Sequence, residues 1–193
     1  MIPSRGPHEL VELVRLDPTL RLDVRYSRSD NFLGKPVYPA PRAFLQRIAA
    51  EALVRIHQGL AQEGLGLLIH DGYRPWSVTR TFWEETPPEL RRFVADPAFG
   101  SRHNRGCAVD LSLFRRDSGQ PLLMPSDFDE FTERAAIDFS DAPAEAIQNR
   151  TRLIQAMATE GFTPYRYEWW HYDHPAWENY PVLDLAFSEI EAR

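Results

Sequence analysis

Two short segments, SRHNRGCAVD in the middle of the chain and EWWH near its end, place the strongest constraint on the fold. They supply the imidazoles of His103 and His171, the carboxylate of Asp110 and a further carboxylate at Glu168. Two imidazoles and one carboxylate can hold a catalytic zinc ion with an open fourth position, and the spare carboxylate can serve as a general base. The set therefore predicts a zinc hydrolase whose fold brings the two segments together.

The segment that carries Asp110 alternates like a β-strand. Apolar side chains at every second position would face a core, whereas Asp110 would point to the opposite side. A lone aspartate in such a place is more often a solvated acid on a strand face. His103 lies just upstream, and Gly106 between them can let the chain turn, which favours a site where both residues bind one metal. The alternating apolar residues are Cys107, Val109, Leu111 and Leu113.

The segment YRYEWWHY is rich in aromatic residues, which favours a strand over a helix. In a regular strand Glu168 and His171, three positions apart, face opposite sides. They can share a site only if the strand ends, twists or bulges between them. The alternative is an aromatic core strand with an incidental glutamate and histidine. His174 competes with His171 as a ligand, but His171 is favoured because it lies inside the aromatic run, whereas His174 precedes a proline and is typical of a loop.

The segment LGLLIHDGYRPW ends an apolar run in residues typical of a turn, where functional side chains often sit on a rigid scaffold. Arg74 in this turn is a candidate to stabilise the oxyanion of a tetrahedral intermediate or to hold a substrate carboxylate. The plainer interpretation is a salt bridge to Asp71. The two roles are compatible, because an acid can orient an arginine that also serves the site. We interpret His70 and His57 as structural or surface histidines.

Several motifs resemble those of the zinc D,D-peptidases. The pattern Ser-x-His-x-x-Gly-x-Ala-x-Asp, followed at a distance by Glu-x-x-His, is similar to theirs, and DGYRP with EWWH narrows the resemblance to the D-alanyl-D-alanine dipeptidase branch. The segment YSRSDNFLGKPVY resembles the N-terminal segment of that branch, and Phe128-Asp129 resembles its acidic element. The similarity runs from about Asp23 to Asp173, which is most of the chain.

The resemblance implies an α+β fold of the Hedgehog/D,D-peptidase type and hydrolysis of the free dipeptide D-Ala-D-Ala to two D-alanines. It also implies one zinc ion per chain as the cofactor. The residues to which it assigns roles are His103, Asp110 and His171 as zinc ligands, Glu168 as general base, Arg74 as transition-state stabiliser, Asp129 and Tyr26 as partners of the dipeptide's amino group, and Ser101 and Tyr38 as lining of the substrate pocket.

Two other functions are compatible with the same motifs. A D,D-carboxypeptidase acting on longer cell-wall peptides would use the same metal chemistry, and only Asp129, the acid for a free amino group, separates it from a dipeptidase. A noncatalytic zinc-binding module would keep the ligands without the chemistry. The presence of both Glu168 and Arg74 speaks against that class.

The composition is ordinary for a globular protein: the 193 residues suit one domain, 1–193, with 43% hydrophobic and 26% charged residues. A net charge of −6 leaves no basic stripe for nucleic acid, so we expect no nucleic-acid partner. The single Cys107 excludes an intrachain disulfide framework, and the strand alternation predicts that it is a small buried hydrophobe. The oligomeric state stays open.

The first ten residues, MIPSRGPHEL, lack the apolar run of a signal peptide, and no segment approaches the length needed to span a membrane. We therefore expect a cytoplasmic protein that does not associate with membranes.

Helical periodicity and strand propensity together predict an α+β domain with a largely antiparallel sheet and helices packed on one face. In the first predicted helix the apolar residues at helical spacing are Phe44, Leu45, Ile48, Ala52, Leu53 and Ile56. Glycines just beyond the two long helices act as stop signals. The predicted helices are 41–62, 140–160 and the shorter 77–84 and 88–95, and the predicted strands are 67–70, 107–114 and 165–170.

Overall fold

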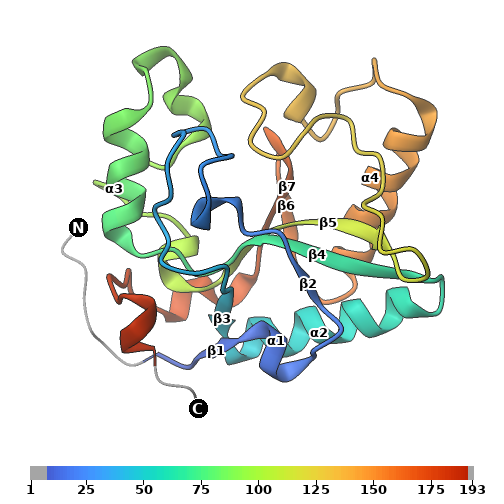
Figure 1. Cartoon of the computed structure of the whole chain (residues 1–193), viewed down its shortest axis with the longest axis horizontal. Helices are drawn as coiled ribbons and strands as arrows, with labels where there is room; N and C mark the ends of the chain where they lie inside the picture. Colours follow the sequence, from blue (N-terminus) through green and yellow to red (C-terminus); the bar gives the residue numbers. More distant parts are fainter. Residues whose placement is uncertain (1–7, 191–193) are drawn as a thin grey trace.

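A five-stranded, mostly antiparallel sheet forms the centre of the molecule (Figure 1). The computed structural model describes residues 8–190. The outermost ends of the predicted domain lie outside the described residues, and so do most of the first ten residues, which lack the apolar run of a signal peptide. The strand order is β2-β4-β5-β7-β6, and only β2 and β4 pair in parallel. This confirms the predicted α+β class. The strands are β2 (Arg21–Leu22), β4 (Leu65–Asp71), β5 (Ala108–Arg115), β7 (Glu168–Asp173) and β6 (Thr163–Tyr165).

Both faces of the two central strands are covered. Every residue of β4 is buried, and β5 is buried up to its last residue. Helix α2 (Arg47–Ala61) lies along one face, and α4 (Ala144–Ala158) packs against α2 and β6 (Figure 1). An irregular segment covers the opposite face, where the ring of Phe128 stacks on His70 at 4.6 Å. The alternating residues of β5 face the core as predicted, and Asp110 is buried rather than solvated.

The predicted helix 41–62 begins later than expected. Phe44–Gln46 is instead a strand, β3, which pairs antiparallel with β1 (Leu10–Glu12) in a small separate sheet. The helix starts only at Arg47, and Ile48 in its first turn is 50% exposed, so Ile48 does not belong to the predicted buried face. The apolar spacing of 44 and 45 reflects burial in a strand, which only the pairing with a distant segment reveals.

The predicted strand 165–170 is a hairpin. Tyr165 ends β6, Glu168 begins β7, and the two residues between them form the turn. Pro164 pairs with Tyr172, but the next pair is Tyr165 with Glu168, so β7 bulges between Glu168 and Tyr172. A second irregularity at the end of β4 shifts its register against β5 between Ile69 and Asp71. The first irregularity includes His171, and the second brings Asp71 opposite Asp110.

The remaining helices are short, apart from α3 (Trp76–Glu85), which directly follows β4 and stands beside the end of the sheet (Figure 1). It corresponds to the predicted helix 77–84, and the predicted segment 88–95 forms a 3-10 helix. Helix α4 ends before Gly161, whose φ of 79° is left-handed. The other elements are α1 (Leu13–Leu16) and the 3-10 helices η1 (Arg25–Ser27), η2 (Pro88–Phe93), η3 (His103–Arg105), η4 (Glu133–Ala135), η5 (Pro175–Asn179) and η6 (Phe187–Glu189).

Within residues 8–190, none of the helices combines the length and the apolar character that crossing a membrane requires.

Candidate active site

The three predicted zinc ligands meet at one end of the central sheet. Asp110 on β5 is the register partner of His171 on β7, so their side chains lie next to each other on one face. His103 belongs to η3, and Gly106 after it has a left-handed φ of 67°, which turns the chain into β5. One ligand atom from each of the three residues lies within 4.8 Å of the others, so this cluster can hold a metal ion.

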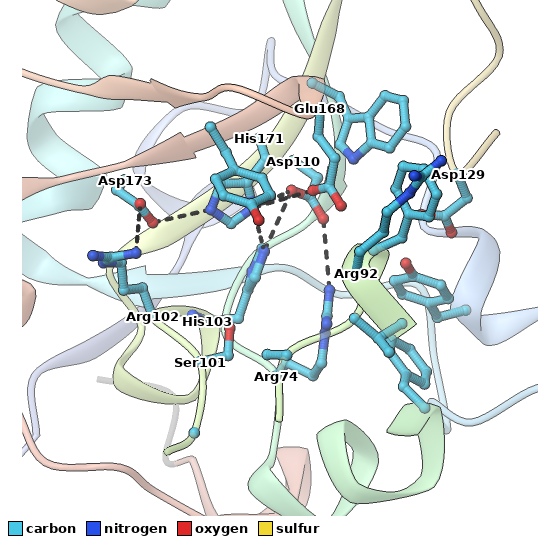
Figure 2. Close-up of a pocket in the computed structure, with 18 of the residues that line it drawn as sticks. Arg74, Arg92, Ser101, Arg102, His103, Asp110, Asp129, Glu168, His171 and Asp173 are labelled. Atoms are coloured by element: carbon cyan, nitrogen blue, oxygen red, sulfur yellow. Dashed lines mark hydrogen bonds and ion pairs between the residues drawn. The ribbon is translucent and has the colours of Figure 1, made fainter. Parts of the chain in front are cut away.

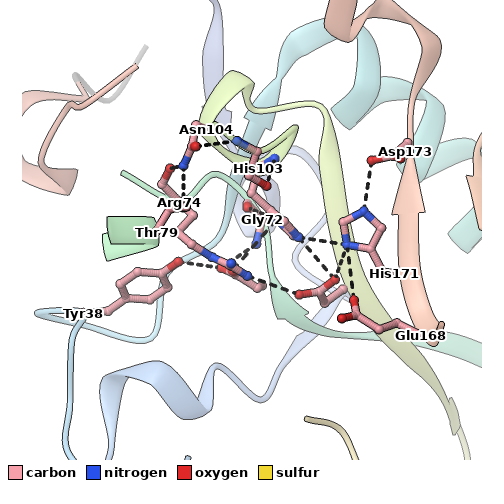
Figure 3. Close-up of polar contacts among 12 residues, drawn as sticks. Tyr38, Gly72, Arg74, Thr79, His103, Asn104, Glu168, His171 and Asp173 are labelled. Atoms are coloured by element: carbon pink, nitrogen blue, oxygen red, sulfur yellow. Dashed lines mark hydrogen bonds and ion pairs between the residues drawn. The ribbon is translucent and has the colours of Figure 1, made fainter. Parts of the chain in front are cut away.

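Both imidazoles are oriented by an acceptor on the ring nitrogen that faces away from the cluster (Figure 3). Nδ1 of His103 lies 2.7 Å from the carbonyl oxygen of Gly72, and Nε2 of His171 lies 3.0 Å from Oδ1 of Asp173. Carbonyl and carboxylate oxygens only accept, so these two nitrogens carry the protons. His103 Nε2 and His171 Nδ1 can then both direct a lone pair into the space beside Asp110, as metal ligation requires.

The distances between the ligand atoms fit a small divalent ion. They are 3.0 Å (His171 Nδ1 to Asp110 Oδ1), 3.1 Å (His171 Nδ1 to His103 Nε2) and 3.3 Å (His103 Nε2 to Asp110 Oδ1). A tetrahedral zinc site with bonds of about 2.0–2.2 Å separates its ligands by about 3.3–3.6 Å, so a small shift suffices. The electrostatics of the cluster also favour a bound cation. Burial lowers the pKa of His171, but hydrogen bonds to Asp110 and Asp173 raise it to about 10, so the metal-free cluster holds a proton on Nδ1 that a bound cation would displace.

The bulge in β7 brings Glu168 to the same cluster. Because the strand alternation is interrupted, Oε2 of Glu168 lies 3.9 Å from Nδ1 of His171. Burial raises the pKa of Glu168 to about 8, an effect that the neighbouring His171 opposes. A cation held by the cluster would lower this pKa, because an opposite charge favours the carboxylate. The Glu168 carboxyl group can therefore exchange a proton beside the cluster near neutral pH.

Arg74 reaches the cluster from the turn after β4. Its Nε and Nη2 atoms lie 2.9 and 2.8 Å from Oδ2 of Asp71, and Nη2 lies 3.6 Å from Oδ2 of Asp110. Burial disfavours its charge, but Asp71 keeps the pKa of Arg74 well above its ordinary value. The salt bridge that the sequence offered as the plainer interpretation is thus present, and it orients the guanidinium toward the cluster.

Tyr38 has a different place from the one the resemblance implied. It does not line the cavity in front of the cluster, because its hydroxyl donates a 2.8 Å hydrogen bond to Oδ1 of Asp71. Its ring packs against Tyr26 and Phe187. Tyr38 therefore supports the Asp71–Arg74 pair from behind.

The cluster opens into a cavity of about 400 Å³, which Ser101, Tyr26 and Asp129 also line (Figure 2). Asp129 has a φ of 61°, and its buried Oδ2 atom has no hydrogen-bond partner among residues 8–190. Burial raises the pKa of Asp129 to about 7, although the Tyr26 hydroxyl lowers it. Oγ of Ser101 accepts a hydrogen bond from the backbone N–H of His103 at 3.1 Å. A buried carboxyl oxygen without a hydrogen-bond partner is costly, which suggests that a polar group of a ligand supplies the partner.

The sequence patterns did not identify three residues that lie beside the cluster. The Asn104 side chain donates to the carbonyl oxygen of Arg74 at 2.8 Å and so ties η3 to the arginine turn. Asp173 orients His171 through Oδ1, and the Oδ2 atom of Asp173 lies 3.2 Å from Nη1 of Arg102. A signal existed for Asp173, because residues two apart in a strand share a face. No comparable signal marks Asn104 or Arg102, whose partners are distant in sequence.

The other histidines and the cysteine do not line the cavity. His174 packs against Phe162, and its Nδ1 accepts a backbone hydrogen bond at the start of η5. Nδ1 of His57 accepts a hydrogen bond from the backbone of Leu67 on β4, and Nε2 of His70, itself on β4, lies 2.9 Å from Oγ of Ser112 on β5, so both histidines are structural. Cys107 is buried, as predicted, and burial raises the pKa of its thiol to about 12.

Comparison with known proteins identifies the family. A peptidase family M15 model, described as D-ala-D-ala dipeptidase, matches residues 6–190. The D-alanyl-D-alanine dipeptidase of Escherichia coli (strain K12) is 36% identical over 180 residues, which cover 93% of this chain and 92% of the relative. The D-alanyl-D-alanine dipeptidase of Enterococcus faecium is 36% identical over 79% of this chain and 85% of its own length. Among solved structures, the LdcB LD-carboxypeptidase aligns over 97% of this chain and 81% of its own, with 18% identity and a TM-score of 0.46. With its sequence matched almost from end to end, this chain belongs to the D-ala-D-ala dipeptidase family of M15 peptidases.

Proposed function

We propose that this protein is a zinc-dependent dipeptidase that hydrolyses free D-Ala-D-Ala to two molecules of D-alanine. The observation that carries the proposal is that one cavity holds the three-ligand cluster, the partly buried Glu168 and the Asp129 carboxyl, whose Oδ2 atom has no hydrogen-bond partner among residues 8–190. Membership in the dipeptidase family supports the same substrate.

His103, Asp110 and His171 would hold the zinc ion, which when bound supplies Lewis-acid chemistry that activates water and polarises a carbonyl group. Glu168 would accept a proton from the attacking water as the new C–O bond forms. It would return that proton to the amide nitrogen as the C–N bond breaks. Proton transfer by a positioned side chain contributes about 10²–10⁴-fold to the rate. The short distance from Glu168 to His171 supports this role.

Arg74 would stabilise the negative charge that develops on the carbonyl oxygen during attack. Its guanidinium is charged, buried and held by Asp71, so it needs little reorganisation as the charge appears. Removing one such donor costs on the order of 10²–10³ in rate. The second hydrogen bond on Asp71, from Tyr38, supports a fixed geometry for this arginine.

Asp129 would bind the ammonium group of the dipeptide with help from the Tyr26 hydroxyl. A free ammonium would supply the partner that Oδ2 lacks and, as an opposite charge, would favour the ionised carboxylate. This preference for a free amino terminus favours a dipeptidase over a D,D-carboxypeptidase that acts on longer wall peptides, whose nitrogen at this point is an uncharged amide.

The test is an assay of purified protein, with its metal content determined, against D-Ala-D-Ala and N-acetyl-D-Ala-D-Ala. Acetylation removes the charge and adds bulk, so kcat/KM should fall at least about tenfold, which corresponds to about 1.4 kcal/mol. Asp129→Asn should reduce the difference in kcat/KM between the free and the acetylated dipeptide. Equal cleavage of the free and acetylated dipeptides by the unaltered protein would overturn the dipeptidase assignment in favour of the carboxypeptidase.

A further inference from the structure

We propose that Arg102 binds the C-terminal carboxylate of the dipeptide, so that the cavity recognises both charged ends of its substrate on opposite sides of the metal cluster. The inference rests on the proposed function and extends it. It assigns Arg102 as a specificity-determining residue and fixes the direction in which the substrate lies.

Opposite charges lie on the two sides of the metal cluster. Figure 2 shows Asp129 on one side of the His171–Asp110 cluster and Arg102 with Asp173 on the other, and Arg102 and Asp129 both line the cavity. A free dipeptide is a zwitterion with its scissile bond between the charged ends. If its ammonium group meets Asp129 and its carbonyl lies beside the cluster, the carboxylate must extend toward Arg102.

The Arg102 side chain is held in place but has unused hydrogen-bond donors. Its guanidinium lies over the ring of Trp177 at 4.7 Å, and Nη1 forms an ion pair with Oδ2 of Asp173 at 3.2 Å. Stacking and one ion pair hold the guanidinium in place, yet the side chain is 45% exposed. No other ion pair or hydrogen bond within residues 8–190 engages this guanidinium, so further N–H donors remain for a carboxylate.

The end of the cavity near Arg102 carries a net positive charge. The Arg105 guanidinium also lies near Trp177, at 5.5 Å, and donates to the backbone carbonyl of Tyr180 rather than to an acid. Asp173 is the carboxylate that lines the cavity beside these two arginines, so this end keeps positive charge. At the other end, the acids Asp129 and Glu168 both line the cavity.

One feature competes with this assignment. Arg92 also lines the cavity, on the side of Asp129, where its positive charge can attract a carboxylate (Figure 2). Its side chain is exposed, and its guanidinium lies over the neighbouring Phe93 ring at 4.8 Å. Arg92 is therefore the matched control: a second cavity arginine that the proposal leaves without a substrate contact.

Arg102 also contacts Asp173, which orients His171, so its removal could impair the site without any contact to substrate. A substrate that lacks the charge separates the two explanations. D-Ala-D-alaninamide keeps the ammonium group and the same scissile bond but replaces the terminal carboxylate by a neutral amide. Damage to the metal site would affect hydrolysis of both substrates equally, whereas loss of a carboxylate contact would affect only the acid.

The experiment compares zinc-loaded wild type, Arg102→Gln, Arg102→Lys and Arg92→Gln on both substrates, with zinc content measured for each protein. Arg102→Gln should lower kcat/KM for D-Ala-D-Ala about tenfold or more, mainly through KM, and should affect the amide far less. The kcat/KM of Arg102→Lys for D-Ala-D-Ala should lie between those of the wild type and Arg102→Gln, because lysine keeps the charge but lacks the planar guanidinium. Arg92→Gln should leave the ratio between the two substrates unchanged.

Equal losses on both substrates in Arg102→Gln would overturn the proposal and leave Arg102 as a positioning residue for Asp173. If Arg92→Gln instead lowers the ratio of kcat/KM for D-Ala-D-Ala to kcat/KM for the amide, the substrate lies in the opposite direction. Wild-type protein that cleaves neither substrate would refute the proposed function itself, which is a distinguishable result.

Discussion

The Nε2 atom of His171 lies 3.0 Å from Oδ1 of Asp173, on the side of the ring opposite the metal-ligand cluster. This contact holds the imidazole so that Nδ1 faces Asp110 at 3.0 Å. Carboxylates in this position typically change metal affinity by about 10–100-fold when they are removed. We therefore expect Asp173→Ala to weaken zinc binding by that order, as measured by competition with a chelator.

Asp173→Asn is the matched variant, because its amide oxygen can still accept the hydrogen bond from Nε2. Its zinc affinity should lie between those of the wild type and Asp173→Ala. If both variants bind zinc as tightly as the wild type, packing alone orients His171 and the contact with Asp173 is incidental.

The choice of His171 over His174 as a zinc ligand can be tested with the pair itself. His171 faces the cluster, whereas His174 lies against Phe162 and accepts a backbone hydrogen bond. Elemental analysis should therefore find that His171→Ala has lost most of its zinc and that His174→Ala retains it. Full zinc occupancy in His171→Ala would show that the ligand set is wrong.

Glu168 should be needed for the reaction but not for the metal. Its carboxylate approaches His171 but is not one of the three atoms that gather at the cluster. Glu168→Gln keeps the size of the side chain and removes its basicity, so kcat should fall by about 10²–10⁴ while zinc content stays the same. Loss of both zinc and activity would instead identify Glu168 as a ligand, and unchanged turnover would exclude it as the general base.

The gathering of the cluster could be predicted because much of it is local. His103, Gly106 and Asp110 lie within one short stretch, and the strand alternation around Asp110 indicates which side its carboxylate occupies. The position of Glu168 could be predicted only conditionally. Its place beside His171 depends on a bulge, and the bulge depends on how β7 pairs with β6, which spacing alone does not reveal.

Other features depend on contacts between distant segments. Phe44–Gln46 has the spacing of a helical turn, but its pairing with Leu10–Glu12 makes it a strand. Tyr38 carries a hydroxyl suited to a pocket, but Asp71 already binds it. In each case a tertiary partner decides between two local possibilities that are close in free energy, so propensity is a weak guide there.

The last prediction concerns His70, which lies outside the site and links stability to pH. Burial lowers the pKa of His70 to about 4. The charged groups around it partly cancel, since Asp23 and Asp110 raise the pKa while Arg25 lowers it. Its Nε2 lies 2.9 Å from Ser112 Oγ, and its ring stacks on Phe128. The folded protein therefore holds this imidazole neutral.

Between about pH 6.5 and about pH 4 the unfolded chain protonates His70 and the folded chain does not, so the free energy of unfolding falls as the pH falls. The contribution is complete above the unfolded pKa and amounts to about 3 kcal/mol, at about 1.36 kcal/mol per pKa unit. Urea unfolding of wild type and His70→Gln at about pH 7.5 and about pH 4 isolates it, because the carboxylates and metal ligands are common to both proteins. The wild type should lose about 3 kcal/mol more than the variant over this range. Parallel losses would mean that His70 titrates alike in the folded and unfolded states.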